Sequence, residues 1–105
     1  MRFLISLRNK ESHYALPVLQ RMKNFEKRVL FIEKNLNQKK CKYAYYHSDL
    51  KGIYLIWDFD SNEEAAHMML ELPGREYVDI NTEPIMEYDS TVKNIKSYFE
   101  LAMKE

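Results

Sequence analysis

The sequence is short of several residue types, and each shortage excludes a class of protein. Its 105 residues include one cysteine, Cys41, which cannot form an internal disulfide and is typical of a reducing, cytoplasmic setting. Its two glycines make phosphate-cradling loops such as the Walker and Rossmann motifs very improbable. No apolar run approaches the roughly 18 residues of a spanning helix, and Met1–Arg8 is too short for a signal peptide. We therefore expect one cytoplasmic domain with no membrane partner.

The net charge is zero, but the charges are unevenly distributed. Residues 1–52 hold 12 Lys and Arg against 4 Asp and Glu, whereas residues 53–105 hold 4 against 12. Halves of opposite sign attract each other within one subunit or across a symmetric pair. The basic half is also a candidate nucleic-acid surface, but the acidic half beside it would repel phosphates. The charge pattern therefore disfavours nucleic acid as a partner.

Apolar periodicity defines the elements of the first half. Alternation of Phe3, Ile5 and Leu7 predicts a strand over residues 1–8. An amphipathic helix of about five turns is expected to begin near Pro17. Its predicted core stripe is Val18, Met22, Phe25, Val29, Ile32 and Leu36. Residues 42–47 and 53–59 follow as strands joined by a turn, and the second is apolar on both faces. We expect it to be central and covered on both sides.

The second half continues with a helix, a strand and a further helix. Ser61 and Glu64 form a capping box at a helix start, and Pro73-Gly74 ends that helix. Residues 76–89 read as extended, with Pro84 at a bulge or sheet edge. Ser90 is expected to cap a helix over residues 90–105. This order predicts an α+β, ferredoxin-like split βαβ (β-α-β-β-α-β) with a C-terminal helical extension.

Such a unit leaves one sheet face without helices. In this sequence that face is rich in tyrosine and apolar side chains, so water covers it poorly. A second copy is the natural cover, and two sheets face to face make a dimeric α/β barrel. We therefore expect a homodimer or a larger homo-oligomer.

Two stretches resemble a known family. Residues 52–64 (GIYLIWDFDSNEE) have the strand–Asp–Ser–Asn–Glu–helix form of muconolactone isomerase-like proteins. Residues 72–74 (LPG), 77–80 (YVDI) and 83–85 (EPI) are similar to the same family. The resemblance covers about residues 52–88 and implies a dimeric α/β-barrel fold, often in larger rings. It also implies a proton shift on a small lactone without a cofactor. It assigns no catalytic residue, because the segment 41–47 departs from the family pattern.

A proton shift beside a carbonyl needs a base and a donor for the developing enolate oxygen. His47 ends a strand that also carries Tyr43 and Tyr45, so we predict His47 as the base and Tyr45 as the donor. Asp79 would orient the imidazole, with Glu83 as the alternative. The competing interpretations are a solvated strand-end histidine, tyrosines in ordinary sheet packing and a salt bridge from Asp79 to Arg8 or Arg2.

Four further residues are candidates for substrate binding. Trp57 and Tyr43 would line the cavity with the catalytic set, Glu83 would lie nearby, and His13 follows the first strand in a loop. Core packing for Trp57 and solvent exposure for His13 and Glu83 are the alternatives. The three histidines, at positions 13, 47 and 67, have no metal-ligand spacing, so neither metal nor cofactor is expected.

The sequence therefore favours a cofactor-independent isomerase-like protein that acts on a small lactone or organic acid. A non-catalytic module for small-ligand binding or oligomerisation is the alternative from another class. A small oxygenase of the same architecture is the third hypothesis, and it requires a pocket open to a flat aromatic substrate.

Overall fold

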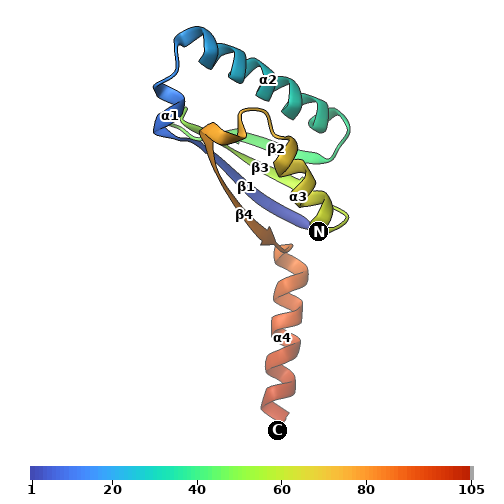
Figure 1. Ribbon diagram of the computed structural model, residues 1–105. Helices are drawn as coiled ribbons and strands as arrows, with labels where there is room; N and C mark the ends of the chain where they lie inside the picture. The colour runs from blue at the N-terminus through green and yellow to red at the C-terminus, as the bar shows by residue number, and fades with distance from the viewer. Residues whose placement is uncertain (105) are drawn as a thin grey trace.

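The computed structural model describes residues 1–104, in which helices cover one face of a four-stranded sheet (Figure 1). The elements in chain order are β1 (Arg2–Asn9), α1 (Glu11–Tyr14), α2 (Val18–Asn37), β2 (Cys41–Tyr46), β3 (Gly52–Asp58), α3 (Asn62–Glu71), η1 (Arg75–Tyr77), β4 (Val78–Ile85) and α4 (Tyr88–Lys104). The strand order is β2-β3-β1-β4, and all neighbouring strands are antiparallel. The α+β ferredoxin-like arrangement is confirmed.

The core lies between the sheet and the helices α2 and α3. Strand alternation turns every second side chain toward the helices, and these are the buried ones. The core residues are Ile5, Leu7, Ile32, Cys41, Ile53, Leu55, Trp57, Phe59, Ala65, Met68, Leu72 and Val78. None of the helices within residues 1–104 combines the length and apolar character needed to cross a membrane.

The helix starts follow the local chemistry of the sequence. Pro17 is the N-cap of α2, and Ser61 is the N-cap of α3, where its hydroxyl accepts from the Glu64 amide at 3.1 Å. The Glu64 carboxylate reaches back one residue farther than expected and accepts from the Asp60 amide at 3.0 Å. Gly74 follows α3 with φ of 69°, a left-handed conformation that favours glycine.

Helix α2 packs on the sheet over only part of its length. Of its predicted core stripe, Ile32 is buried, whereas Val18, Met22 and Phe25 are 71, 48 and 51% exposed. The stripe prediction is therefore wrong for the first two turns. The physical reason is that the polar residue Asn24 is buried here instead, at 7% exposed, while Phe25 borders a pocket described below.

Strand β3 is central, as predicted, but only one of its faces is covered within the chain. Trp57 and Leu55 lie under the helices, each 1% exposed, whereas Tyr54 on the opposite face is 43% exposed. That opposite side of the sheet, which we call the open face, also presents Tyr43 and Tyr45. The expected double cover of β3 is absent within residues 1–104.

The C-terminal region differs from the prediction in its boundaries. Strand β4 is shorter than the predicted extended segment, and Pro84 lies on it at the sheet edge, as expected. Helix α4 begins two residues before Ser90, which is not its cap, because the Ser90 hydroxyl donates to the Glu87 carbonyl. Helix α4 projects away from the sheet and buries none of its described residues (Figure 1). It extends the long dimension of the molecule to 65 Å.

Candidate functional site

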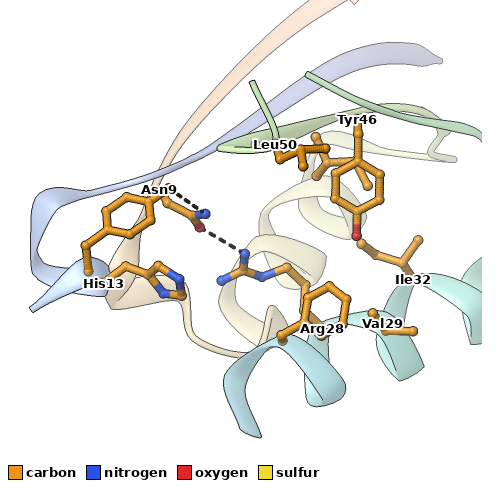
Figure 2. A pocket seen from close by; sticks show the side chains of 11 residues that line it. Asn9, His13, Arg28, Val29, Ile32, Tyr46 and Leu50 are labelled. Atoms are coloured by element: carbon orange, nitrogen blue, oxygen red, sulfur yellow. Dashed lines mark hydrogen bonds between the residues drawn. The ribbon is translucent and has the colours of Figure 1, made fainter. Parts of the chain in front are cut away.

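A pocket of about 190 Å³ lies between the sheet and the middle of α2, at the end of the sheet where α1 begins. Figure 2 shows the side chains around it. Its walls come from α1, α2, the end of β1 and the β2–β3 hairpin. The lining residues are Asn9, His13, Tyr14, Phe25, Arg28, Val29, Ile32, Tyr46, Leu50, Gly52 and Ile53.

The charged group of this pocket is the guanidinium of Arg28. Its Nη1 donates to the Asn9 side-chain oxygen at 3.1 Å. Its Nε and Nη2 are buried and have no hydrogen-bond partner within residues 1–104, and no ion pair in this range includes Arg28. Burial lowers the pKa of Arg28, although the nearby Tyr46 opposes the shift. A half-buried guanidinium without a carboxylate is costly, and an anionic group beside it would offset that cost.

His13 supplies the titratable group beside this cation. In Figure 2 its imidazole points toward the guanidinium of Arg28. The pKa of His13 is lowered from 6.5, first by burial and then by the positive charges of Arg28 and Arg21. The ring is therefore mostly neutral at pH 7, and its buried Nδ1 has no partner among the described residues. A neutral imidazole held near a guanidinium can accept a proton from a bound anion.

The remaining walls of the pocket are apolar. Phe25, Val29 and Ile32 come from one face of α2, and Ile53 comes from the covered side of β3. Tyr46 stands at the end of β2, next to Leu50 in the hairpin loop (Figure 2). A ligand that matches these walls has a small apolar body and at least one anionic group.

The structure places most of the predicted site residues on the open face, away from this pocket. Tyr43 and Tyr45 stack at 6.4 Å between ring centroids, and Tyr45 lies opposite Tyr54 in the β2–β3 register. On β4, Asp79 lies opposite Arg8 and Glu83 opposite Leu4. A shallow hollow of about 250 Å³ on this face is lined by Leu4, Ser6, Tyr54, Asn81 and Glu83. Among the predicted site residues, only His13 lines the pocket beneath α2.

Trp57 does not share a cavity with the tyrosines. It lies on the covered face, where its ring stacks on Phe31 and on Phe59 at centroid distances of 6.2 and 5.6 Å. A bulge between Cys41 and Tyr43 changes the facing of β2, so Cys41 points to the core while Tyr43 points to the open face. Because of this bulge, the alternation of side chains along β2 does not predict that Tyr43 and Trp57 lie on opposite faces of the sheet.

His47 is held on the open face by charged neighbours other than Asp79. Its Nδ1 lies 3.0 Å from Arg8 Nη1, and the other arm of Arg8 pairs with Asp49 at 2.6 Å. Because a guanidinium can only donate, His47 Nδ1 accepts, and the neutral ring carries its proton on Nε2. Nε2 is buried without a partner within residues 1–104. The nitrogen lone pair that a base needs is therefore engaged by Arg8.

Gly52 and the ion pair between Arg8 and Asp49 fix the position of the His47 ring. A Cβ at Gly52 would lie 2.8 Å from the ring and 2.4 Å from the Leu7 carbonyl, so glycine is required there. The ring also packs on Tyr54 with centroids 4.2 Å apart. The Arg8 side chain and the Lys51 amide both bond to Asp49 and lower its pKa to about 2. Asp49 therefore stays ionised and anchors the β2–β3 loop.

Other reactive groups do not form a site among the described residues. Cys41 is 1% exposed, and burial raises the pKa of its thiol to about 11, so little thiolate forms near pH 7. Within residues 1–104, no cluster of three or more His, Cys, Asp or Glu side chains could hold a metal ion.

Arg28 was not predicted as a site residue, because in the sequence it is one of 12 Lys and Arg in residues 1–52. The signal was its position, three residues after Phe25 and directly before Val29 on the predicted stripe. A cation next to the apolar face of a helix is expected to be partly buried. Asn9 and Tyr46 gave no comparable signal, because their roles depend on how the hairpin and α2 meet.

Comparisons with known proteins agree with this architecture. No protein family and no curated protein matches the chain by sequence. The solved structure of muconolactone isomerase superposes with a TM-score of 0.71 and 16% identity, covering 86% of this chain and 93% of that one. This chain has the muconolactone isomerase fold. The 5-chloro-2-hydroxyhydroquinone dehydrochlorinase TftG from Burkholderia phenoliruptrix AC1100, in complex with 2,5-dihydroxybenzoquinone, is also similar. Its TM-score is 0.67 at 16% identity, with 86% of this chain and 98% of that chain covered. The resemblance found in the sequence is therefore confirmed for the fold.

Proposed function

We propose that this protein is a muconolactone isomerase-like enzyme that shifts a proton within a small lactone or organic acid without a cofactor. The observation that carries the proposal is the half-buried guanidinium of Arg28, which has no carboxylate partner within residues 1–104 and lies beside the neutral imidazole of His13. A buried cation without a partner suits an anionic ligand, and a neutral histidine next to it suits proton transfer.

The proposed step moves one proton and leaves the electron count unchanged. The guanidinium of Arg28, which lines the pocket, holds an anionic or carbonyl oxygen of the substrate. His13 takes a proton from the carbon next to the carbonyl, and the electron pair of that C–H bond delocalises onto the oxygen as an enolate. Arg28 stabilises this oxygen. The imidazolium then returns the proton to a different carbon of the same anion, which completes the isomerisation.

His47 with Tyr45 and Asp79 remains the competing assignment for the catalytic set. Geometry favours His13 as the base, because the lone pair of His47 Nδ1 accepts from Arg8. Tyr45 is 61% exposed on the open face, where water competes for its hydroxyl. The two assignments differ in the histidine whose removal stops the reaction.

Deuterium exchange separates these possibilities. Muconolactone is incubated in D₂O with the full-length protein, and incorporation of deuterium is followed by NMR. We expect the wild type to catalyse exchange and His13→Ala to be at least about a hundredfold slower, the usual scale of general base catalysis. His67→Ala is the matched control, because His67 is on the exposed side of α3.

Three outcomes of this experiment decide between the hypotheses. A larger loss in His47→Ala than in His13→Ala would move the base to the open face. Wild-type protein that binds muconolactone without any exchange would select the non-catalytic binding module. Absence of both binding and exchange would contradict the proposed isomerase.

We also propose that the open face pairs with the open face of a second copy. Tyr43, Tyr45 and Tyr54 are 53, 61 and 43% exposed on it, a large apolar area for a soluble surface. The two sheet edges have opposite charge, with Lys42 on β2 and Asp79 and Glu83 on β4. In a two-fold pair whose axis runs along the strands, the β2 edge of one copy faces the β4 edge of the other.

Light scattering tests this pairing. We expect the wild type to have the mass of a dimer or a larger assembly at micromolar concentration, and Tyr45→Lys to shift it toward the monomer. Leu70→Lys is the control, since Leu70 on α3 is similarly exposed, at 65%, but lies outside the open face. A monomeric wild type, or equal effects of the two variants, would contradict the pairing.

A further inference from the structure

We infer that Leu50 is a specificity-determining lid residue, which closes over the apolar part of a ligand bound at Arg28. This inference rests on the proposed function, because it concerns the same pocket. It begins from an unusual backbone conformation in the β2–β3 hairpin loop. Leu50 has φ of 62°, in the left-handed region that glycine and asparagine adopt more easily than a branched aliphatic residue.

The positive φ of Leu50 occurs at a residue that lines the pocket. Its side chain lines the pocket next to Tyr46, across the cavity from Arg28 and Val29 (Figure 2). It is nevertheless 75% exposed. An exposed leucine at the rim of a cavity gains free energy by covering an apolar ligand, because both lose contact with water.

The loop is held so that this strained conformation persists. The Leu50 amide donates to the His47 carbonyl at 2.9 Å, and the Lys51 amide donates to Asp49 Oδ1 at 2.9 Å. Arg8 ties Asp49 to β1 at 2.6 Å. Strained backbone conformations that surrounding hydrogen bonds hold in place are often found at ligand sites. In this arrangement Arg8, His47 and Asp49 position the loop, and Leu50 meets the ligand.

The chain contains a matched control for backbone strain. Lys39 is the other non-glycine residue with positive φ among the described residues, at 60°. It follows the C-terminus of α2, where its amide donates to the Leu36 carbonyl, and it does not line the pocket. Glycine at either position relieves the same kind of strain, but only the change at Leu50 removes a pocket wall.

The test compares two carboxylates by NMR titration of the full-length protein. Acetate carries an anionic group with almost no apolar body, whereas benzoate adds a flat apolar ring. We expect Leu50→Gly to weaken benzoate binding about five- to tenfold, the effect of losing part of a leucine contact, and to leave acetate binding unchanged. Its melting temperature should be unchanged or raised. Leu50→Met should retain wild-type affinity for benzoate, and Lys39→Gly should leave both affinities unchanged.

The outcomes distinguish the lid from the pocket itself. If the wild type binds benzoate and Leu50→Gly binds it equally well, the lid is contradicted and the pocket proposal stands. Equal weakening of acetate and benzoate by Leu50→Gly would also contradict it, because a lid acts on the apolar part alone. If neither carboxylate shifts the resonances of Leu50 or Ile53 in the wild type, both the lid and the proposed function are overturned.

Discussion

The two halves of α2 meet the sheet in different ways. In the second half, Ile32 and Asn35 are 7 and 8% exposed, and Phe31 stacks on Trp57. In the first half, Phe25 is 51% exposed and Val18 71%, although both continue the same apolar stripe. The same apolar stripe is therefore buried toward the C-terminal end of α2 (residues 31–37, the packed end), whereas in residues 18–29 (the open end) it is exposed or borders the pocket.

The difference indicates that the two ends of α2 have different roles. At the packed end Phe31 stacks on Trp57 and Trp57 stacks on Phe59, so these contacts contribute mainly to stability. The open end contains Arg28, whose guanidinium cannot be packed into a dry core without a partner. A small anion could supply that partner. We therefore expect the packed end of α2 to contribute mainly to the free energy of unfolding, and the open end to bind the ligand.

Removing the central aromatic residue of the packed end should have the largest effect. Trp57→Ala deletes a ring that is 1% exposed and stacked between Phe31 and Phe59. We expect the free energy of unfolding to fall by about 3–5 kcal/mol, measured by urea denaturation. A loss below about 1 kcal/mol would show that this end is not the stabilising half.

Changing the charge of the open end should separate binding from stability. Arg28→Met replaces a half-buried cation with an apolar side chain of similar length. We expect benzoate to bind at least about tenfold more weakly, because a charge-assisted hydrogen bond is lost. Because the removed charge has no carboxylate partner among the described residues, stability to urea should be unchanged or slightly higher. If Arg28→Met were markedly destabilised but bound benzoate normally, Arg28 would contribute to stability and not to ligand binding.

Truncating an apolar residue at the open end should cost little stability. Phe25→Ala removes a ring that is already half exposed, so we expect a loss below about 1 kcal/mol in urea denaturation. The comparison with Trp57→Ala is direct, since both changes remove an aromatic ring. Similar losses in the two variants would erase the contrast between the ends of α2.

The smallest expected effect concerns the acid end of the pH range. The native pKa of Asp49 is lowered to about 2 from an ordinary value of 3.8. Its contribution to stability is therefore complete above about pH 4 and is lost as the pH falls toward 2. Asp49→Asn should flatten this part of the curve of melting temperature against pH. A curve with the wild-type slope between pH 4 and 2 would show that Asp49 does not anchor the loop.

Much of the fold follows from local patterns in the sequence. Alternation in Phe3, Ile5 and Leu7 predicted β1 and its covered face, and Ser61 predicted the start of α3. The position of β3 in the centre of the sheet followed from its apolar composition. These features depend on neighbouring residues alone, so a sequence is enough to find them.

The site was harder to predict, because it depends on how separate elements meet. His13 was identified as a candidate from its place after β1, but Arg28 was not, since its burial depends on the spacing between α2 and the sheet. The facing of Tyr43 relative to Trp57 depends on a bulge that alternation does not reveal. The apolar periodicity of α4 predicted a helix, but it did not predict that this helix projects away from the sheet and buries none of its described residues.

The pKa of His13 reports directly on whether an anion binds at Arg28. Arg28 and Arg21 lower it together with burial, so a carboxylate bound at Arg28 should neutralise part of that charge and raise the pKa. The measurement is an NMR titration of the His13 ring with and without saturating benzoate. The account predicts a value below 6.5 in the free protein and a clear upward shift with benzoate. A His13 pKa that benzoate leaves unchanged would contradict an anion site beside this histidine.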